Sequence, residues 1–282
     1  MKIVYDPSCL SYQQSGHPES PRRVKLAYEY LTGSYEGDAE IIVPEAASEA
    51  DILTVHSPKH LETVRNGWYM DPDTPALPFM FDHALKSVGG ALTAMRLAFE
   101  NDTHGSSERE PVISLMRPPG HHAGRDYLGG FCYFNNVAIA TARALEQVGK
   151  VAIIDFDCHH GNGTEDIFRH NDRVIYMSLH QSPFYPGTGL RSEGNIINYP
   201  LGDGTDDTSW LAALDDGLGK IRTWGPDLMA VSAGFDSYEK DRFSFHMLRL
   251  ETFERVGEKI AALGKPVFSV LEGGYSDEVG RC

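Results

Sequence analysis

From residue 111 onward, the chain alternates short apolar runs with longer amphipathic stretches. The short runs are rich in β-branched residues and apolar on both faces, as in parallel strands that helices cover on both sides. This rhythm predicts the α/β class, with a central parallel sheet and helices on both faces. The expected strands are 111–116, 151–157, 174–179, 228–233 and 266–271. The expected helices are 82–100, 133–148, 209–224 and 246–263.

The length of the chain allows one large domain or two small ones, because 282 residues, 41% of them hydrophobic, can bury a sizeable core. The sequence contains no internal repeat. Its most polar stretch, 101–110, is too short for a domain linker and predicts an exposed loop. We therefore expect a single domain over residues 1–282.

The formal net charge of -15 argues against binding to a nucleic-acid backbone or to an anionic membrane. It would suit a cationic substrate, such as a lysine-rich tail or a polyamine. Alternatively, the negative charge only keeps the protein in solution, because copies of the chain repel one another.

The four cysteines form no Cys-x-x-Cys pair, and a domain of this size does not need disulfides. The first residues lack the apolar core of a signal peptide, and no window approaches a membrane span. These features predict reduced thiols and a cytoplasmic location.

Each expected strand is followed at once by polar or glycine-rich sequence. In open α/β sheets, functional sites form outside the carboxyl ends of the strands. Reactive groups from five strands would therefore meet at one edge of the sheet. The segments concerned begin at Arg117, Cys158, His180, Gly234 and Glu272.

The strand expected at 151–157 runs directly into Asp157 and His159. Alternate residues of an extended chain share a face, so Asp155, Asp157 and His159 would point the same way. Together with Asp236, which follows the strand at 228–233, Asp157 and His159 would hold a divalent metal and leave a position open for water. For Asp236 alone, capping of the next helix is an equally good explanation.

Three further groups have a functional and a structural interpretation. His121 and His122 follow a rigid Pro-Pro-Gly turn and could act as a general base and its electrostatic partner, or form an exposed pair. Tyr275 follows two glycines, and its hydroxyl could reach a bound carbonyl. Phe131 and Tyr185 could line a narrow channel or belong to the core.

Six motifs in one order give the chain a resemblance to the histone deacetylase superfamily, which has an arginase-like α/β fold and includes the acetylpolyamine amidohydrolases. The resemblance extends from about Gly16 to Tyr275. The motifs are Gly-His-Pro-Glu-Ser-Pro-Arg-Arg at 16–23, Arg-Pro-Pro-Gly-His-His at 117–122, Gly-Gly-Phe-Cys-Tyr-Phe-Asn-Asn at 129–136, Asp-x-Asp-x-His-His-Gly-Asn-Gly at 155–163, Ser-Ala-Gly-Phe-Asp at 232–236 and Leu-Glu-Gly-Gly-Tyr at 271–275.

The resemblance implies roles for the residues at the matching positions. The zinc ligands would be Asp157, His159 and Asp236, and the oxygen-rich set would also accept Fe(II), Co(II) or Mn(II). His122 would be the general base and acid, and His121, oriented by Asp155, its electrostatic partner. Tyr275 would polarise the amide carbonyl. Asn162, an Asp in some relatives, would leave His122 less biased toward its cationic form.

The same resemblance implies a substrate channel and a second cation site. Phe131 and Tyr185 would flank the channel, Gly130 would contact the substrate, and Asp73 would be an acid at the rim. Arg23 would line an inner cavity through which acetate leaves. A structural potassium ion would bind the backbone around Asp155, Asp157 and His159, together with Ser178 and Leu179.

Three departures from the family pattern bear on the function. Phe243 occupies a position where some acetylpolyamine enzymes carry an acid at the mouth of the channel, which weakens the polyamine interpretation. Tyr185 adds a hydroxyl where relatives usually have Phe. The chain ends at Cys282, where relatives continue into a closing helix, so part of the last strand would be left uncovered.

The sequence thus predicts a zinc-dependent deacetylase that hydrolyses N-acetyl amides of lysine side chains in proteins or peptides. The alternatives are an acetylpolyamine or other small-molecule amidohydrolase, and a non-catalytic module that binds acetyl-lysine. Binuclear, arginase-like hydrolysis would need additional bridging carboxylates. Neither the oligomeric state nor the preferred acyl length follows from the sequence.

Overall fold

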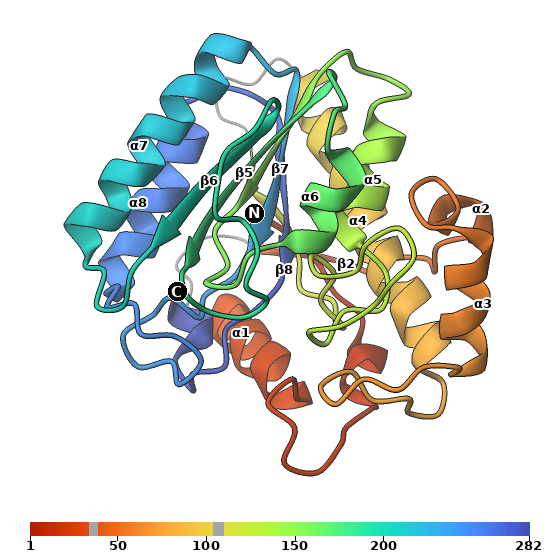
Figure 1. Ribbon diagram of the computed structural model, residues 1–282. Coiled ribbons are helices and arrows are strands. Elements are labelled where there is room, and N and C mark those ends of the chain that lie inside the picture. The colour runs from red at the N-terminus through yellow and green to blue at the C-terminus, as the bar shows by residue number, and fades with distance from the viewer. Residues whose placement is uncertain (34–38, 104–109) are drawn as a thin grey trace.

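The computed structural model describes residues 1–33, 39–103 and 110–282. Its centre is an eight-stranded sheet of order β2-β1-β3-β8-β7-β4-β5-β6, in which all neighbouring strands are parallel (Figure 1). The strands are β1 (Lys2–Val4), β2 (Glu40–Ile42), β3 (Val112–Ser114), β4 (Val151–Asp155), β5 (Val174–Gln181), β6 (Ile196–Leu201), β7 (Leu228–Ala233) and β8 (Val267–Leu271).

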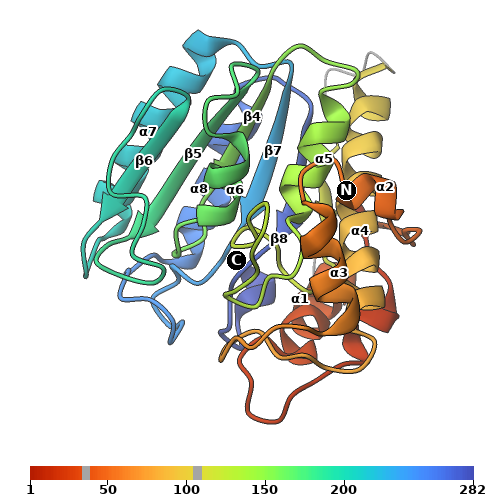
Figure 2. The same ribbon diagram turned by 45° about the vertical axis from the view of Figure 1, so that its right-hand side comes forward.

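Helices cover both faces of this sheet, as predicted. Figures 1 and 2 show α7 and α8 on one face and α4 and α5 on the other. The α-helices are α1 (Pro21–Gly33), α2 (Glu49–Ile52), α3 (Pro58–Asn66), α4 (Met80–Thr103), α5 (Asn136–Ala144), α6 (Asn162–Phe168), α7 (Asp207–Trp224) and α8 (Leu250–Ala261). Among the described residues, none of these helices has both the length and the apolar character needed to cross a bilayer.

The alternation of strand side chains divides the core between the two faces. In β4, Val151 and Ile153 belong to the cluster that includes α4 and α5, whereas Ala152 and Ile154 belong to the cluster that includes α7 and α8. All four side chains are fully buried. Burial on both faces explains why this strand is a continuous apolar run rather than an alternating one.

The five predicted strands are present, with ends that differ by up to two residues. The strand predicted at 111–116 is shorter, over Val112–Ser114, and β4 ends at Asp155 rather than at residue 157. The four predicted helices are also present. The helix predicted at 133–148 begins only at Asn136, because the Asn135 side chain accepts a hydrogen bond from Ala138 N and caps it.

Several elements were not predicted, and most of them are short. Strands β1 and β2 have three residues each, and β6 contains Pro200, which is tolerated at the sheet edge that this strand forms. Helices α1, α2, α3 and α6 were also missed. Helix α4 continues to Thr103, so the loop predicted at 101–110 is wrong at its start, and residues 104–109 lie outside the described ranges.

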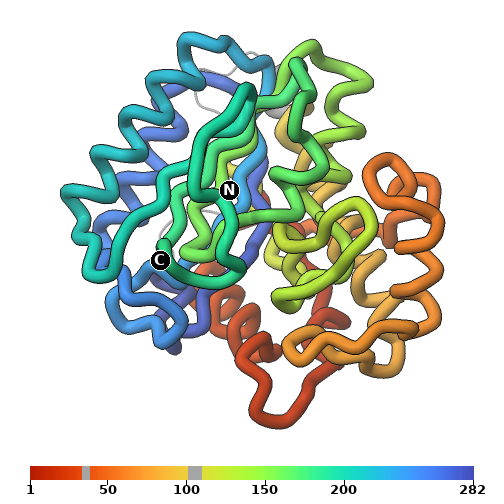
Figure 3. Tube along the Cα trace, in the orientation of Figure 1, coloured from red at the N-terminus to blue at the C-terminus, as the bar shows by residue number. Residues whose placement is uncertain are grey.

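The N-terminal helix α1 lies against the last turn of the chain, η2 (Val279–Arg281), which the trace in Figure 3 shows as neighbouring red and blue segments. A methyl group placed on Gly280 would lie 2.7 Å from Leu26 O and 2.9 Å from Tyr30 Cβ. The backbone of η2 is therefore packed directly on helix α1.

A buried ion pair attaches the segment before α1 to the loop after β3. Arg117 donates from Nε and Nη2 to the two carboxylate oxygens of Glu19, each at 2.7 Å. Its Nη1 donates to Cys9 O and Tyr12 O, and its guanidinium lies 3.7 Å from the centre of the Tyr12 ring. The Arg117 and Glu19 side chains are only 1% and 4% exposed, so each charge depends on the other.

We expect Arg117→Ala to lower the free energy of unfolding by roughly 3–5 kcal/mol, because it removes the bidentate partner of the buried Glu19 carboxylate and leaves it only the single ion pair with Arg23 Nη1 at 3.2 Å. Chemical denaturation followed by circular dichroism measures this change. The matched control is Arg22→Ala, which removes an exposed ion pair with Asp277 and should have little effect. Equal destabilisation by both variants would contradict the role assigned to the buried pair.

Candidate active site

The loops after β3, β8, β7 and β4 lie side by side, because these four strands are consecutive neighbours in the parallel sheet. Their carboxyl ends therefore meet at one edge, as the sequence predicted. The loop after β3 carries the two histidines of the Pro-Pro-Gly turn, the loop after β4 carries Asp157 and His159, and the loop after β7 carries Asp236. Tyr275 follows β8.

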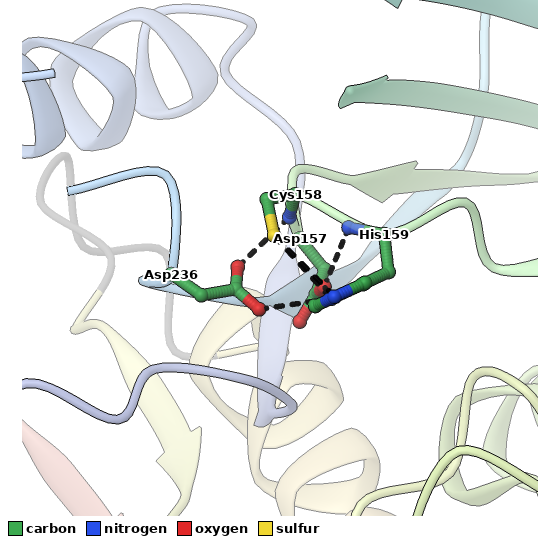
Figure 4. Close-up of side chains that lie close together, drawn as sticks. All are labelled: Asp157, Cys158, His159 and Asp236. Carbon is green, nitrogen blue, oxygen red and sulfur yellow. Dashed lines mark hydrogen bonds and ion pairs between the residues drawn. The ribbon is translucent and has the colours of Figure 1, made fainter. Parts of the chain in front are cut away.

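Asp157, His159 and Asp236 form a compact cluster at this edge (Figure 4). His159 Nδ1 lies 3.0 Å from Asp157 Oδ1 and 3.1 Å from Asp236 Oδ2. Backbone N–H groups hold both carboxylates: Asp157 Oδ2 accepts from Gly273 N at 2.7 Å, and Asp236 Oδ1 accepts from Cys158 N at 2.8 Å. The other oxygen of each carboxylate, Asp157 Oδ1 and Asp236 Oδ2, therefore faces the His159 imidazole.

The cluster fits a divalent metal. Asp236 Oδ2 is buried and makes no hydrogen bond within the described part of the chain, although an oxygen so placed would need a compensating partner. Two carboxylate oxygens and one imidazole nitrogen are donors that suit zinc and similar divalent cations. The backbone passes very close: a methyl group on Gly273 would lie 2.3 Å from Asp236 Oδ2 and 2.5 Å from Asp157 Oδ2.

The pKa shifts of the cluster also favour a bound cation. Burial raises the pKa of Asp236, and the charge of Asp157 raises it further, to about 6. Burial alone would lower the pKa of His159, but the two carboxylates outweigh it and raise that pKa to about 10. Two buried carboxylates so close together call for positive charge between them.

His121 and His122 have opposite electrostatic surroundings. Burial would lower the pKa of His121, but the charges of Asp155, Asp157 and Glu272 raise it to about 10. Its Nδ1 donates to Asp155 Oδ2 at 3.1 Å. Burial and the neighbouring charges of His121 and His159 instead hold the pKa of His122 well below its usual range.

Asn162 makes the same kind of contact with His122 Nδ1 that Asp155 makes with His121 Nδ1. His122 Nδ1 lies 2.7 Å from Asn162 Oδ1, at the first residue of α6. An amide oxygen accepts a hydrogen bond but adds no negative charge, so it orients the imidazole without favouring the cation. The pair thus combines one charged and one neutral imidazole, a division that acid–base catalysis can use.

Glu272, to which the sequence analysis gave no role of its own, fixes the histidine turn. Its Oε2 accepts hydrogen bonds from Gly120 N at 2.7 Å and His121 N at 3.1 Å, and its Oε1 accepts from Ser232 Oγ at 3.2 Å. The side chain is fully buried, and burial raises its pKa to about 7. Only its place between a predicted strand and Gly-Gly could have signalled it.

A cavity of about 420 Å³ opens over the cluster. Its lining brings together most of the residues that the sequence predicted to contact substrate. The predicted residues that line the cavity are Asp73, Gly130, Phe131, Tyr185, Phe243 and Tyr275, together with His121, His122 and His159. Five lining residues were missed, among them Pro18, Pro119 and Gly273. The other two are aromatic: His17, whose ring meets the edge of Phe131 at 4.8 Å, and Phe184, which stacks on His159 at 5.3 Å.

Gly130 could not be replaced without disturbing His122. Its φ of +54° is in the left-handed region, and a methyl group there would lie 2.4 Å from His122 Cδ2. One loop therefore supplies the wall of the cavity and the backbone that passes over the imidazole.

The remaining predicted residues lie beside the cavity. Arg23 is not in its lining but is buried behind Tyr275, with its guanidinium 4.6 Å from the centre of the tyrosine ring. Ser178 pairs with Asp155 across β4 and β5, and Ser178 and Leu179 are fully buried. The potassium site predicted there stays a prediction.

Known proteins resemble this chain in sequence and in fold. The family model described as the histone deacetylase domain matches residues 17–282. The chain belongs to the histone deacetylase family. It is accordingly a hydrolase of a family that is generally metal-dependent, and it carries a residue cluster suited to a metal.

Two curated relatives of this histone deacetylase family member come from Archaeoglobus fulgidus and Pseudomonas aeruginosa. It is 34% identical over 299 residues to a probable deacetylase of Archaeoglobus fulgidus, covering 98% of this chain and 81% of that protein. It is 40% identical over 225 residues to acetylpolyamine amidohydrolase 1 of Pseudomonas aeruginosa, covering 75% of this chain and 63% of that protein.

Solved structures of the family share the fold. The HD domain of HDA15 superposes with a TM-score of 0.89 at 29% identity, covering 100% of this chain and 88% of that one. An acetylpolyamine aminohydrolase from Burkholderia pseudomallei also gives a TM-score of 0.89, at 27% identity, covering 100% and 96% of the two chains. The predicted deacetylase-like α/β fold is confirmed.

Asp157→Ala and His159→Ala should each abolish metal binding and turnover, because each removes one of the three candidate ligand side chains from a buried cluster. Metal content after dialysis, measured by mass spectrometry, reports binding without relying on activity. Asp215→Ala, which removes a surface carboxylate paired with Lys259, serves as the control and should keep its metal. Full activity of Asp157→Ala after metal-free purification would refute the assignment.

Proposed function

We propose that this chain is a metal-dependent amidohydrolase that removes the acetyl group from N-acetylated polyamines. The observation that carries the proposal is the cavity of about 420 Å³. Aromatic rings line part of it, and His121, His122, His159 and Tyr275 line the rest together with smaller residues. A narrow aromatic cavity accepts a slender alkyl stem, and the polar groups are those that amide hydrolysis requires.

The choice of polyamines rests on charge at the mouth of the cavity. A methyl group on Gly129 would lie 3.5 Å from Tyr185 Oη and 3.7 Å from Asp71 Oδ2, so that carboxylate lies near Tyr185, a residue of the cavity lining. Asp73 also lines the cavity. An acetylated polyamine keeps a positive charge beyond its acetyl-bearing arm, whereas an acetyl-lysine peptide presents a neutral backbone there. Several curated relatives are named acetylpolyamine amidohydrolases, which also supports this choice.

A second candidate is the one that the sequence analysis placed first, hydrolysis of acetyl-lysine side chains. Phe243 favours it, because an apolar side chain lines the cavity where an acid would attract a free amine. Both candidates require the same reaction and the same residues.

In this mechanism a divalent metal held by Asp157, His159 and Asp236 would polarise the acetyl carbonyl and activate the attacking water. His122, kept neutral by its surroundings, accepts the proton of that water and later gives it to the departing amine. His121, held cationic between carboxylates, offsets the negative charge that develops on the substrate. Water adds to the carbonyl, the C–N bond breaks, and acetate and a free amine leave.

Tyr275 is the proposed hydrogen-bond donor to the carbonyl oxygen. Burial, with the charges of Asp236 and Asp157, raises the pKa of its hydroxyl well above the usual range, so the proton needed for donation stays in place. The ring is fixed by Phe131 at 5.9 Å and Phe243 at 4.7 Å. Its backbone N–H donates to Asp241 Oδ2.

Tyr275→Phe should lower kcat by roughly 100- to 1,000-fold, the usual effect of removing one donor to the oxyanion. The ring and its contacts remain, so metal content and thermal stability should not change. Steady-state kinetics on the metal-loaded enzyme, with metal analysis of the same sample, provide the measurement. Turnover near the wild-type rate would show that the phenol takes no part in the reaction.

A substrate panel separates the two candidates. We expect metal-loaded enzyme to give a higher kcat/KM on N-acetylputrescine and N-acetylspermidine than on an acetyl-lysine peptide, with a preference that weakens as salt screens the acids at the mouth. The opposite order would favour acetyl-lysine. Absence of acetate release from every substrate, in a sample whose metal content is verified, would overturn the proposed function.

A further inference from the structure

The amide of Asn162 has two chemically different ends, and different groups contact them. Its carbonyl oxygen Oδ1 lies 2.7 Å from His122 Nδ1, and its Nδ2 donates to Tyr127 Oη at 3.3 Å. Because the oxygen can only accept and the nitrogen can only donate, the direction of the amide decides what His122 Nδ1 must do.

The Tyr127 hydroxyl favours one direction of this amide. It donates its single proton to the backbone carbonyl of Asn162 at 3.3 Å. The side of the hydroxyl that faces the Asn162 side chain is therefore an acceptor, which pairs with an NH₂ group and repels a second acceptor. With the NH₂ group held by Tyr127, the amide oxygen must face His122.

This direction has a consequence for the imidazole. An amide oxygen beside Nδ1 requires the proton of neutral His122 to be on Nδ1, which leaves Nε2 free to accept a proton. With the amide reversed, its NH₂ group would face Nδ1, and the ring proton would move to Nε2. In that tautomer His122 could not act as a base from Nε2.

We propose that Tyr127 is a positioning residue that sets the tautomer of His122 by orienting the amide of Asn162. This inference rests on the proposed function only where it uses His122 as the proton acceptor. The tautomer itself is a property of the protein, whatever its substrate.

The chain builds a specific place for the Tyr127 ring. A methyl group on Gly124 would lie 2.2 Å from two ring carbons of Tyr127, so the ring packs directly on the glycine backbone. Gly124 N also donates to Tyr127 O at 3.0 Å. The ring is 39% exposed, yet burial and the charge of Asp166 raise the pKa of its hydroxyl to about 12, which keeps the donated proton in place.

The first test is Tyr127→Phe, which removes the hydroxyl and keeps the ring. Because one partly exposed hydrogen-bond pair is lost, kcat should fall by roughly three- to tenfold while KM and metal content stay unchanged. Tyr199→Phe, which removes a surface hydroxyl bonded to Asp216, is the matched control and should behave like the wild type. A change in KM or thermal stability with unchanged kcat would show a merely structural role.

A second measurement reads the tautomer directly. In protein labelled with ¹⁵N-histidine, the two nitrogens of His122 report which one carries the proton, and the loss of these signals in His122→Gln assigns them among the 12 histidines. We expect a protonated Nδ1 in the wild type and a mixture of tautomers in Tyr127→Phe. An unchanged tautomer in Tyr127→Phe would overturn the proposal, even in a sample without measurable turnover.

The decisive control is Asn162→Asp. A carboxylate presents two equivalent acceptor oxygens, so it needs no partner to orient it. In the Asn162→Asp background, Tyr127→Phe should therefore have no further effect on kcat. A decrease as large as in the Asn162 background would mean that Tyr127 acts by another route, and the proposal would fail.

Discussion

The structure depends on the burial of negative charge at the carboxyl edge of the sheet. Asp155, Asp157, Asp236 and Glu272 are all fully or almost fully buried there, within a few strands of one another. Each carboxylate needs donors or cations to make its burial tolerable. Backbone N–H groups of the strand-end loops and the histidines that face the acids supply them, and a divalent cation would add to them, so folding this edge also assembles the site.

The two histidines of the turn differ because of the residues behind them. His121 is backed by Asp155, which is fixed in turn by the Tyr176 hydroxyl at 2.9 Å. His122 is backed by the uncharged amide of Asn162. Neighbouring imidazoles with the same covalent structure are thus given different charges. A like-charged pair would repel, since the ring centres are 4.0 Å apart.

The sequence was informative where burial imposes a pattern. The central strands are apolar on both faces, so their positions and the meeting of Asp157, His159 and Asp236 could be predicted. Short edge strands such as β1 and β2 bury too few residues to leave a pattern. Glu272 and Tyr127 were missed for another reason: each acts through hydrogen bonds to residues distant in the chain, and no local periodicity encodes such contacts.

The close approach of Gly130 to His122 links two properties that an enzyme would otherwise vary separately. Gly130 lines the cavity and also lies against the imidazole proposed as the base, with no space for even one added methyl group. Evolution of a narrower channel at this point would alter the reaction centre as well. A change of substrate size would be easier at Phe243, which lines the cavity from another loop.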